Sequence, residues 1–174
     1  MNPSPRLRTL LSTAAIVAVG AGGATAASLQ SAAVKITPSG VGAVKLGKTY
    51  KSLHDAGLIG KIHHGCELGG ANTRSANLKA PLKGQVNFTL HSPRKVTDIT
   101  INGGAKARGV GIGDKIADIK AAFPKAKVDH STDHTFELTL VRIPKNGGGK
   151  MIFGVSTKTK RVTTIGVPFI AFCE

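Results

Sequence analysis

Two stretches of the chain, VKLGKTYKSL at Val44–Leu53 and VGIGDKIADI at Val110–Ile119, share one pattern at an offset of 66 residues. In each stretch, two alternating apolar residues precede a glycine, and a short amphipathic segment follows. Further along, KVTDITI at Lys95–Ile101 resembles RVTTIGV at Arg161–Val167 at the same offset. Because two separate matches share one offset, the sequence predicts two copies of one structural unit.

Each copy is predicted to begin with a strand, to turn at a glycine and to continue as a short helix. The strands are expected at 44–46 and 110–112, where apolar residues alternate. Apolar residues then recur at helical spacing, at Tyr50, Leu53 and Gly57 in the first copy and at Ile116, Ile119 and Phe123 in the second. We expect Asp114 or Lys115 to begin the second helix and Pro124 to end it.

Pairs of strands are predicted after each helix. Alternating apolar residues favour hairpins that join Val86–Leu90 to Val96–Ile101 and Met151–Val155 to Val162–Val167. A further strand is expected at Phe136–Ile143. The predicted fold class is therefore α+β, with two copies of a strand–helix–hairpin unit and short helices packed on an antiparallel sheet.

The first residues have the layout of a secretory signal peptide. Arg6 and Arg8 precede an apolar run from Thr9 to Gly20, and the small residues Ala24-Thr25-Ala26 form a cleavage pattern. The run is too short to cross roughly 30 Å of hydrocarbon, which favours a cleaved peptide over an uncleaved anchor. We expect cleavage after Ala26 or Ala27 and no transmembrane segment in the chain that remains.

The predicted organisation has four parts. Residues 1–26 form the signal peptide, and 27–35 form an N-terminal linker. Repeat unit 1 covers 36–102 and repeat unit 2 covers 105–174, both within one compact mature domain. A single unit of about 66 residues would be marginally stable, so the two are expected to share a sheet or a core.

Positive charge is the main compositional feature of the chain. Lys and Arg number 24 and Asp and Glu number 9, so the formal net charge is +15. Outside a cell, a basic surface of this kind attracts anionic envelope polymers; the alternative is that the charge only keeps the protein soluble. The candidate polyanion-binding residues are Lys125, Lys127, Lys158, Lys160 and Arg161. With six Phe, one Tyr and no Trp, and no reading helix, specific nucleic-acid binding is not expected.

No catalytic residue, metal site or cofactor is predicted. Two groups combine potential metal ligands, namely His54, Asp55, His63, His64, Cys66 and Glu67, and Asp129, His130, Asp133 and His134. Neither spacing fits a standard metal motif, so solvated polar loops are the favoured interpretation. Gly42–Thr49 matches the phosphate-loop pattern GxxxxGK[ST], but apolar residues fill its interior, which favours a chance match.

The repeated pattern also resembles known families. The matching residues are VKLGKTY at Val44–Tyr50 and VGIGDKI at Val110–Ile116. Twice over in an exported chain, this arrangement resembles the tandem architecture of the β-lactamase inhibitory protein family, and it is similar to small outer-membrane lipoprotein domains. The chain departs from the lipoproteins in having no lipidation cysteine, and from the inhibitors in having few aromatic residues. The resemblance covers most of 40–170 and implies a binding or scaffold module.

Together these features predict a secreted, non-enzymatic binding module. We expect an extracellular location, with association to the cell wall or envelope through the basic surface. The expected partner is an anionic envelope polymer. The alternative is an extracellular protein, with the chain acting as a secreted inhibitor of an extracellular enzyme.

Cys66 and Cys173 are predicted to form a disulfide, because two cysteines in an oxidising compartment most simply pair with each other. A reactive thiol or a metal ligand is the less favoured alternative, since the chain has no CxxC motif. The closed loop would stabilise the fold by about 4–5 kcal/mol in the chain-entropy model. Thiol labelling of the native exported protein should modify neither cysteine until a reductant is added. Two labelled thiols without reductant would refute the pairing.

Overall fold

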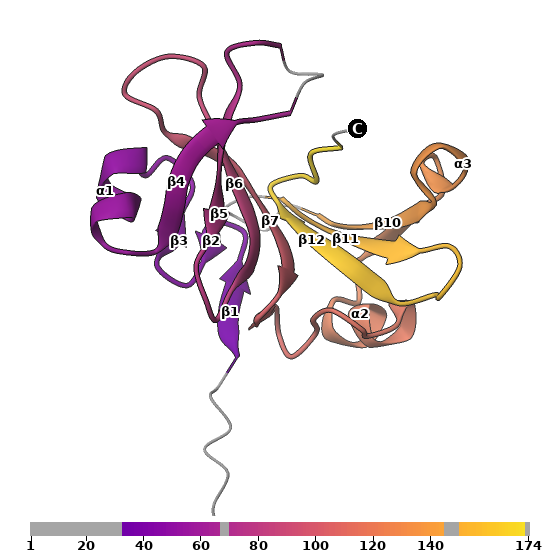
Figure 1. Cartoon of the computed structure of the whole chain (residues 1–174). Helices are drawn as coiled ribbons and strands as arrows, with labels where there is room; N and C mark the ends of the chain where they lie inside the picture. Colours follow the sequence, from indigo (N-terminus) through magenta and orange to yellow (C-terminus); the bar gives the residue numbers. More distant parts are fainter. Residues whose placement is uncertain (1–32, 67–69, 145–149, 173–174) are drawn as a thin grey trace, which may run out of the picture. The chain divides into compact units, whose positions relative to one another are not determined.

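An eight-stranded antiparallel sheet dominates the computed structural model, which describes residues 33–66, 70–144 and 150–172 (Figure 1). All of these residues lie in the compact unit Ala32–Glu174. In spatial order the strands are β4 (Ile59–His64), β5 (Arg74–Leu78), β6 (Lys83–Phe88), β7 (Val96–Gly103), β12 (Val162–Val167), β11 (Met151–Ser156), β10 (Leu138–Ile143) and β9 (Lys127–Asp129).

A smaller sheet and three short helices complete the described part of the chain. The smaller sheet has the order β3 (Val44–Lys45), β2 (Gly40–Val41), β1 (Val34–Thr37) and β8 (Ala105–Lys106), and only β1 and β8 run parallel. The helices are α1 (Tyr50–Asp55), α2 (Ile116–Ala122) and α3 (Asp133–Phe136).

The predicted α+β fold class is wrong. Of the described residues, 47% are in strands and 13% in helices, and the strands form sheets of four and eight. The helices contain six, seven and four residues, so they do not make a layer that covers a sheet. Helices do form where the apolar residues recur at helical spacing. Each of α1 and α2 contributes only one buried side chain, Leu53 and Ile119 respectively.

Local signals explain why these helices are short. The side chain of Thr49 caps α1 by accepting a hydrogen bond from the N–H of Ser52, and Gly57 follows the helix with a φ of +70°. Lys115 is the N-cap of α2, and its N–H donates to the carboxylate of Asp118. The predicted end of this helix is confirmed, because Pro124 follows its C-cap residue.

Most of the predicted strands are confirmed. The two hairpins appear as β6–β7 and β11–β12, and the strand expected at Phe136–Ile143 begins two residues later, at Leu138. The strand predicted at 110–112 is absent, because Ala107–Val110 forms a tight turn instead. Six strands were not predicted, namely β1, β2, β4, β5, β8 and β9. The residues of β4 and β5, IGKIHH and RSANL, lack a regular apolar alternation, and β2 and β8 contain two residues each.

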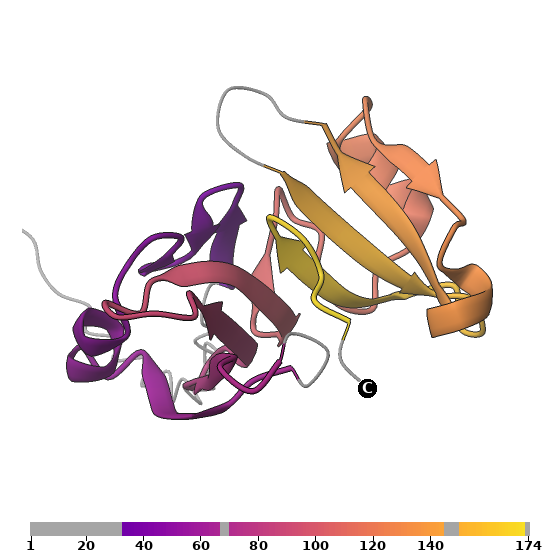
Figure 2. The ribbon, with the colours of Figure 1, turned by 90° about the horizontal axis from the view of Figure 1, so that it is seen from above.

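The pairing of β7 with β12 joins two groups of four strands into one sheet (Figures 1 and 2). Ile101 lies opposite Ile165, and Ile99 lies opposite Val167; none of these four side chains is exposed. They belong to the main hydrophobic core, which also contains Leu53 and Ile119 from α1 and α2. The face of the sheet that carries these residues is therefore the core face.

The opposite, outer face of the sheet is partly covered by the C-terminal segment 168–172. Ile170 and Phe172 pack on Leu140 and Ile152, which alternate with core residues along β10 and β11. Two glycines make room for the segment. A Cβ on Gly166 would lie 2.2 Å from the carbonyl oxygen of Phe169, and one on Gly154 would lie 3.2 Å from the side chain of Ile170.

Gly166→Ala is therefore expected to lower the free energy of unfolding by more than about 1 kcal/mol, since backbone must move to admit the methyl group. Gly60→Ala in β4 is the matched control. Its Cβ would meet no atom closer than 3.7 Å, so we expect a change within about 0.5 kcal/mol. Urea unfolding of both variants measures the difference, and equal effects would contradict the proposed packing.

Candidate functional site

The five predicted polyanion-binding residues lie in two groups rather than one. Lys125 and Lys127 lie at the end of the sheet where Lys127 pairs with Arg142. The other three follow Ser156, which pairs with Leu138 at the opposite end of β10. Leu138 and Arg142 are four positions apart along β10, a span of about 13 Å. A single small anion could not contact both groups.

The group at the β11–β12 turn consists of Lys158, Lys160 and Arg161. The Nζ of Lys158 lies 2.7 Å from the carboxylate of Glu137. The guanidinium of Arg161 donates to the carbonyl oxygen of Gly113 at 2.8 Å, which connects the turn to the segment before α2. Lys160 has a φ of +58° and is exposed.

Internal contacts occupy the carboxylates of the described residues. All seven accept a hydrogen bond or form an ion pair. Asp129 accepts from Ser131 and from Arg142 at 2.7 Å, and these bonds lower its pKa to about 2, the contribution of Ser131 being the larger. Of the 21 Lys and Arg residues in the described part, three form ion pairs with carboxylates, namely Lys51, Arg142 and Lys158.

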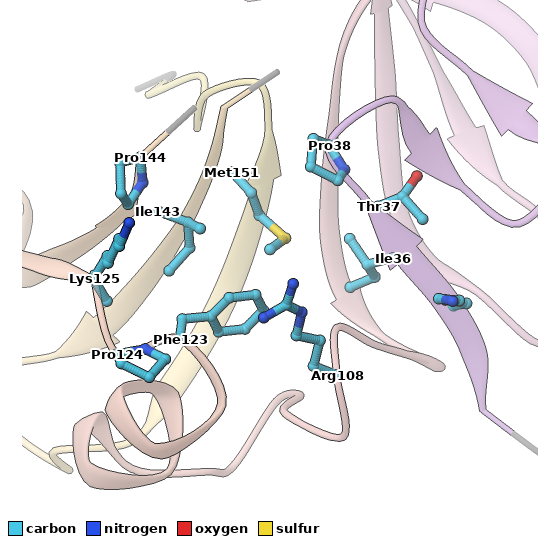
Figure 3. Close-up of a pocket in the computed structure, with 12 residues that line it drawn as sticks. Ile36, Thr37, Pro38, Arg108, Phe123, Pro124, Lys125, Ile143, Pro144 and Met151 are labelled. Carbon is cyan, nitrogen blue, oxygen red and sulfur yellow. The ribbon is translucent and has the colours of Figure 1, made fainter. Parts of the chain in front are cut away.

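A pocket of about 500 Å³ lies between β1 and the C-terminal end of α2 (Figure 3). Its apolar lining comes from Ile36, Pro38, Phe123, Pro124, Ala126, Ile143, Pro144 and Met151. Lys35, Arg108 and Lys125 also line it, and no described acidic residue does. Only Lys125 among these was predicted. Arg108 was not predicted. It precedes Gly109 in a two-residue hairpin turn, a place where Asn-Gly is the favoured pair, so an arginine there is unusual.

Two groups of histidines and acids were considered as metal ligands and interpreted as polar loops, and their described side chains do not gather around one position. His63 and His64 lie on β4 and contact backbone carbonyls, and Nδ1 of His130 lies 2.8 Å from the carboxylate of Asp133. Within 33–66, 70–144 and 150–172, no three His, Cys, Asp or Glu side chains are placed to hold one metal ion. Glu67 lies outside these ranges.

A buried polar row crosses the outer face of β5, β6 and β7. Ser75 donates to the side-chain oxygen of Asn87, and the amide of Asn87 donates to Asp98 at 2.7 Å. Asp98 is 3% exposed and also accepts from the hydroxyl of Thr97 at 3.0 Å. Burial raises the pKa of this carboxyl above its usual value, and the two hydrogen bonds oppose that effect. Asp98 is a structural group here.

The predicted signal peptide and Cys173 both lie outside the described residues. The sulfur of Cys66 lies 3.4 Å from the carbonyl oxygen of Phe172, the residue before Cys173 in the sequence. The disulfide remains a prediction.

Comparisons with protein-family models, curated proteins and solved structures found no match. The resemblance to the inhibitory protein and lipoprotein families therefore remains an expectation from the sequence. Among the described helices, none has the length and apolar character needed to cross a bilayer.

Asp98→Asn is expected to raise the free energy of unfolding at pH 7. The folded protein binds the Asp98 proton more tightly than the unfolded chain, whose pKa is 3.8, so ionisation above that pH disfavours folding. The gain should shrink as the pH falls from the raised pKa of folded Asp98 towards 3.8, and it should be absent well below 3.8. Asp129→Asn is a control of opposite sign, because the pKa of Asp129 is lowered and its stabilising contribution is present at pH 7. Urea unfolding of both variants at pH 7 and pH 3 measures these effects; a loss for Asp98→Asn at pH 7 would contradict the argument.

Proposed function

We propose that the chain is a secreted, non-enzymatic binding module that associates with anionic polymers of the cell envelope. The excess of uncompensated positive charge is the observation that carries this proposal. The described residues include 21 lysines and arginines but seven carboxylates, so most of the positive charge has no acidic side chain to neutralise it. Such a surface gathers polyanions by long-range attraction and by release of their counterions.

The exposed apolar surface gives less support to the alternative, a protein-binding inhibitor. Large apolar side chains that are at least 36% exposed in the described part are Leu90, Ile112 and Phe169. They follow β6, precede α2 and belong to the C-terminal segment, and of the three only Phe169 is aromatic. Protein interfaces usually have a central cluster of aromatic and apolar side chains. An electrostatic partner is therefore the better-supported one.

Cosedimentation of the exported protein with cell envelopes across a salt series tests the proposal. With three to five phosphate-like contacts, we expect affinity to fall roughly 40- to 500-fold between about 50 and 200 mM salt. Replacing Lys158, Lys160 and Arg161 by Glu should weaken binding further and reduce the salt dependence. No binding at low salt would overturn the proposal.

A second variant with the same change in net charge tests whether binding depends on the residues of the β11–β12 turn or only on the total charge of the protein. Lys45, Lys48 and Lys61 lie in or beside β3 and β4, in the other half of the chain. Replacing these three by Glu should weaken binding less than the change at the β11–β12 turn. Equal losses would show that the turn has no special role.

A further inference from the structure

We infer that the pocket between β1 and α2 binds an anionic amphiphile, a small molecule with one apolar chain and a phosphate or carboxylate group. This inference goes beyond envelope association, because the ligand would enter a pocket and not lie along the surface. It does not depend on the proposed function. The apolar lining, the local charge and the backbone at Arg108 carry it separately.

The pocket is suited in size and lining to the apolar part of such a ligand. Its volume of about 500 Å³ falls within the range of small-molecule sites, about 300–1,000 Å³. Ile36, Phe123 and Met151 form part of its wall and are held in place by the main core, where they are 3%, 8% and 2% exposed. The wall is thus largely preformed, so binding would require little reorganisation.

The charged residues of the pocket select an anionic group. Lys35 comes from β1, Arg108 from the turn after β8, and Lys125 from the segment between α2 and β9. Three basic residues from three segments line one apolar pocket, and no described carboxylate lines it. A neutral or cationic ligand would leave this charge uncompensated, whereas a phosphate or carboxylate would neutralise part of it.

Arg108 occupies a position where its backbone conformation is unfavourable. Ala107 and Val110 exchange two backbone hydrogen bonds, and the residues between them, Arg108 and Gly109, have φ values of +49° and +86°. This two-residue hairpin turn favours Asn-Gly, because a residue with a longer side chain is strained at positive φ. A strained residue that points its side chain into a pocket is a candidate for a functional role.

The guanidinium of Arg108 is placed to meet a ligand. Figure 3 shows it between the ring of Phe123 and the side chain of Ile36. It lies 5.1 Å from the centre of the Phe123 ring, and its Nη1 donates to the carbonyl oxygen of Ala122 at 3.3 Å. No other hydrogen bond of this side chain involves a described residue, so further N–H groups are available for a bidentate contact with phosphate or carboxylate.

Methyl NMR provides a direct test, because the chain contains only two methionines, Met1 and Met151. In the full chain labelled with ¹³C-methyl methionine, dodecyl phosphate below its micelle concentration should shift the Met151 signal in a saturable way. Dodecyltrimethylammonium should bind at least tenfold more weakly. An unmoved Met151 signal, or equal affinity for the cationic amphiphile, would overturn the inference.

Arg108→Asn separates the ligand contact from folding. Asn suits the turn, so urea unfolding should show no loss of stability, while the affinity for dodecyl phosphate should fall about tenfold or more. Lys79→Asn is the control for charge alone. It also removes one positive charge, from an exposed residue after β5, and should change the affinity less than twofold. Equal losses in the two variants would refute a specific role for Arg108.

The ligand could be free in solution or part of a membrane. Vesicles of phosphatidylcholine with phosphatidic acid distinguish the two sources once dodecyl phosphate binding is established. If saturating dodecyl phosphate releases the protein from the vesicles, a membrane lipid enters the pocket. If the protein does not bind the vesicles, the pocket binds a soluble amphiphile. If the protein does not bind envelopes but dodecyl phosphate still shifts the Met151 signal, the proposed function is rejected and the inference about the pocket stands.

Discussion

The antiparallel pairing of β7 with β12 is the contact on which the rest of the structure depends. Each group of four strands is small, and a domain of that size buries too little apolar surface to be more than marginally stable. Pairing along one strand places Ile99 and Ile101 against Val167 and Ile165, and the two halves then share one core. Because α1 and α2 contribute one fully buried residue each, the sheet and not the helices supplies most of this core.

The sequence was informative where apolar residues dominate a strand and uninformative where polar residues occupy one. The apolar residues of β11 (MIFGVS) and of β12 (VTTIGV) located both strands within one residue. β5 carries Ser75 and Asn77 on its outer face, and only its pairing with β6 on one side and β4 on the other makes it a strand. Tertiary pairing of this kind leaves no local signal, so the strand content was underestimated and the fold class was wrong.

The candidate site was predictable in chemistry but not in geometry. Composition alone indicated a surplus of positive charge, and Lys125, which the sequence predicted as a polyanion-binding residue, lines the pocket. Lys125 lines the pocket together with Arg108 and Lys35 because β1 pairs with β8. These strands are about 70 residues apart in the sequence, and no local pattern reveals their pairing. The sequence also could not show that Lys158, Lys160 and Arg161 lie at the other end of β10.

The same residue that shortens α2 also helps to form the pocket. Pro124 excludes the helical conformation at Phe123, whose φ and ψ of −134° and 78° turn the chain away from the helix axis. Had α2 continued, its next turn would follow a different course from the segment Phe123–Ala126, which now lines the pocket. The break also frees the carbonyl of Ala122 from helical bonding, and this carbonyl accepts the hydrogen bond from Arg108. Helix termination thus positions both the apolar wall and the cation above it.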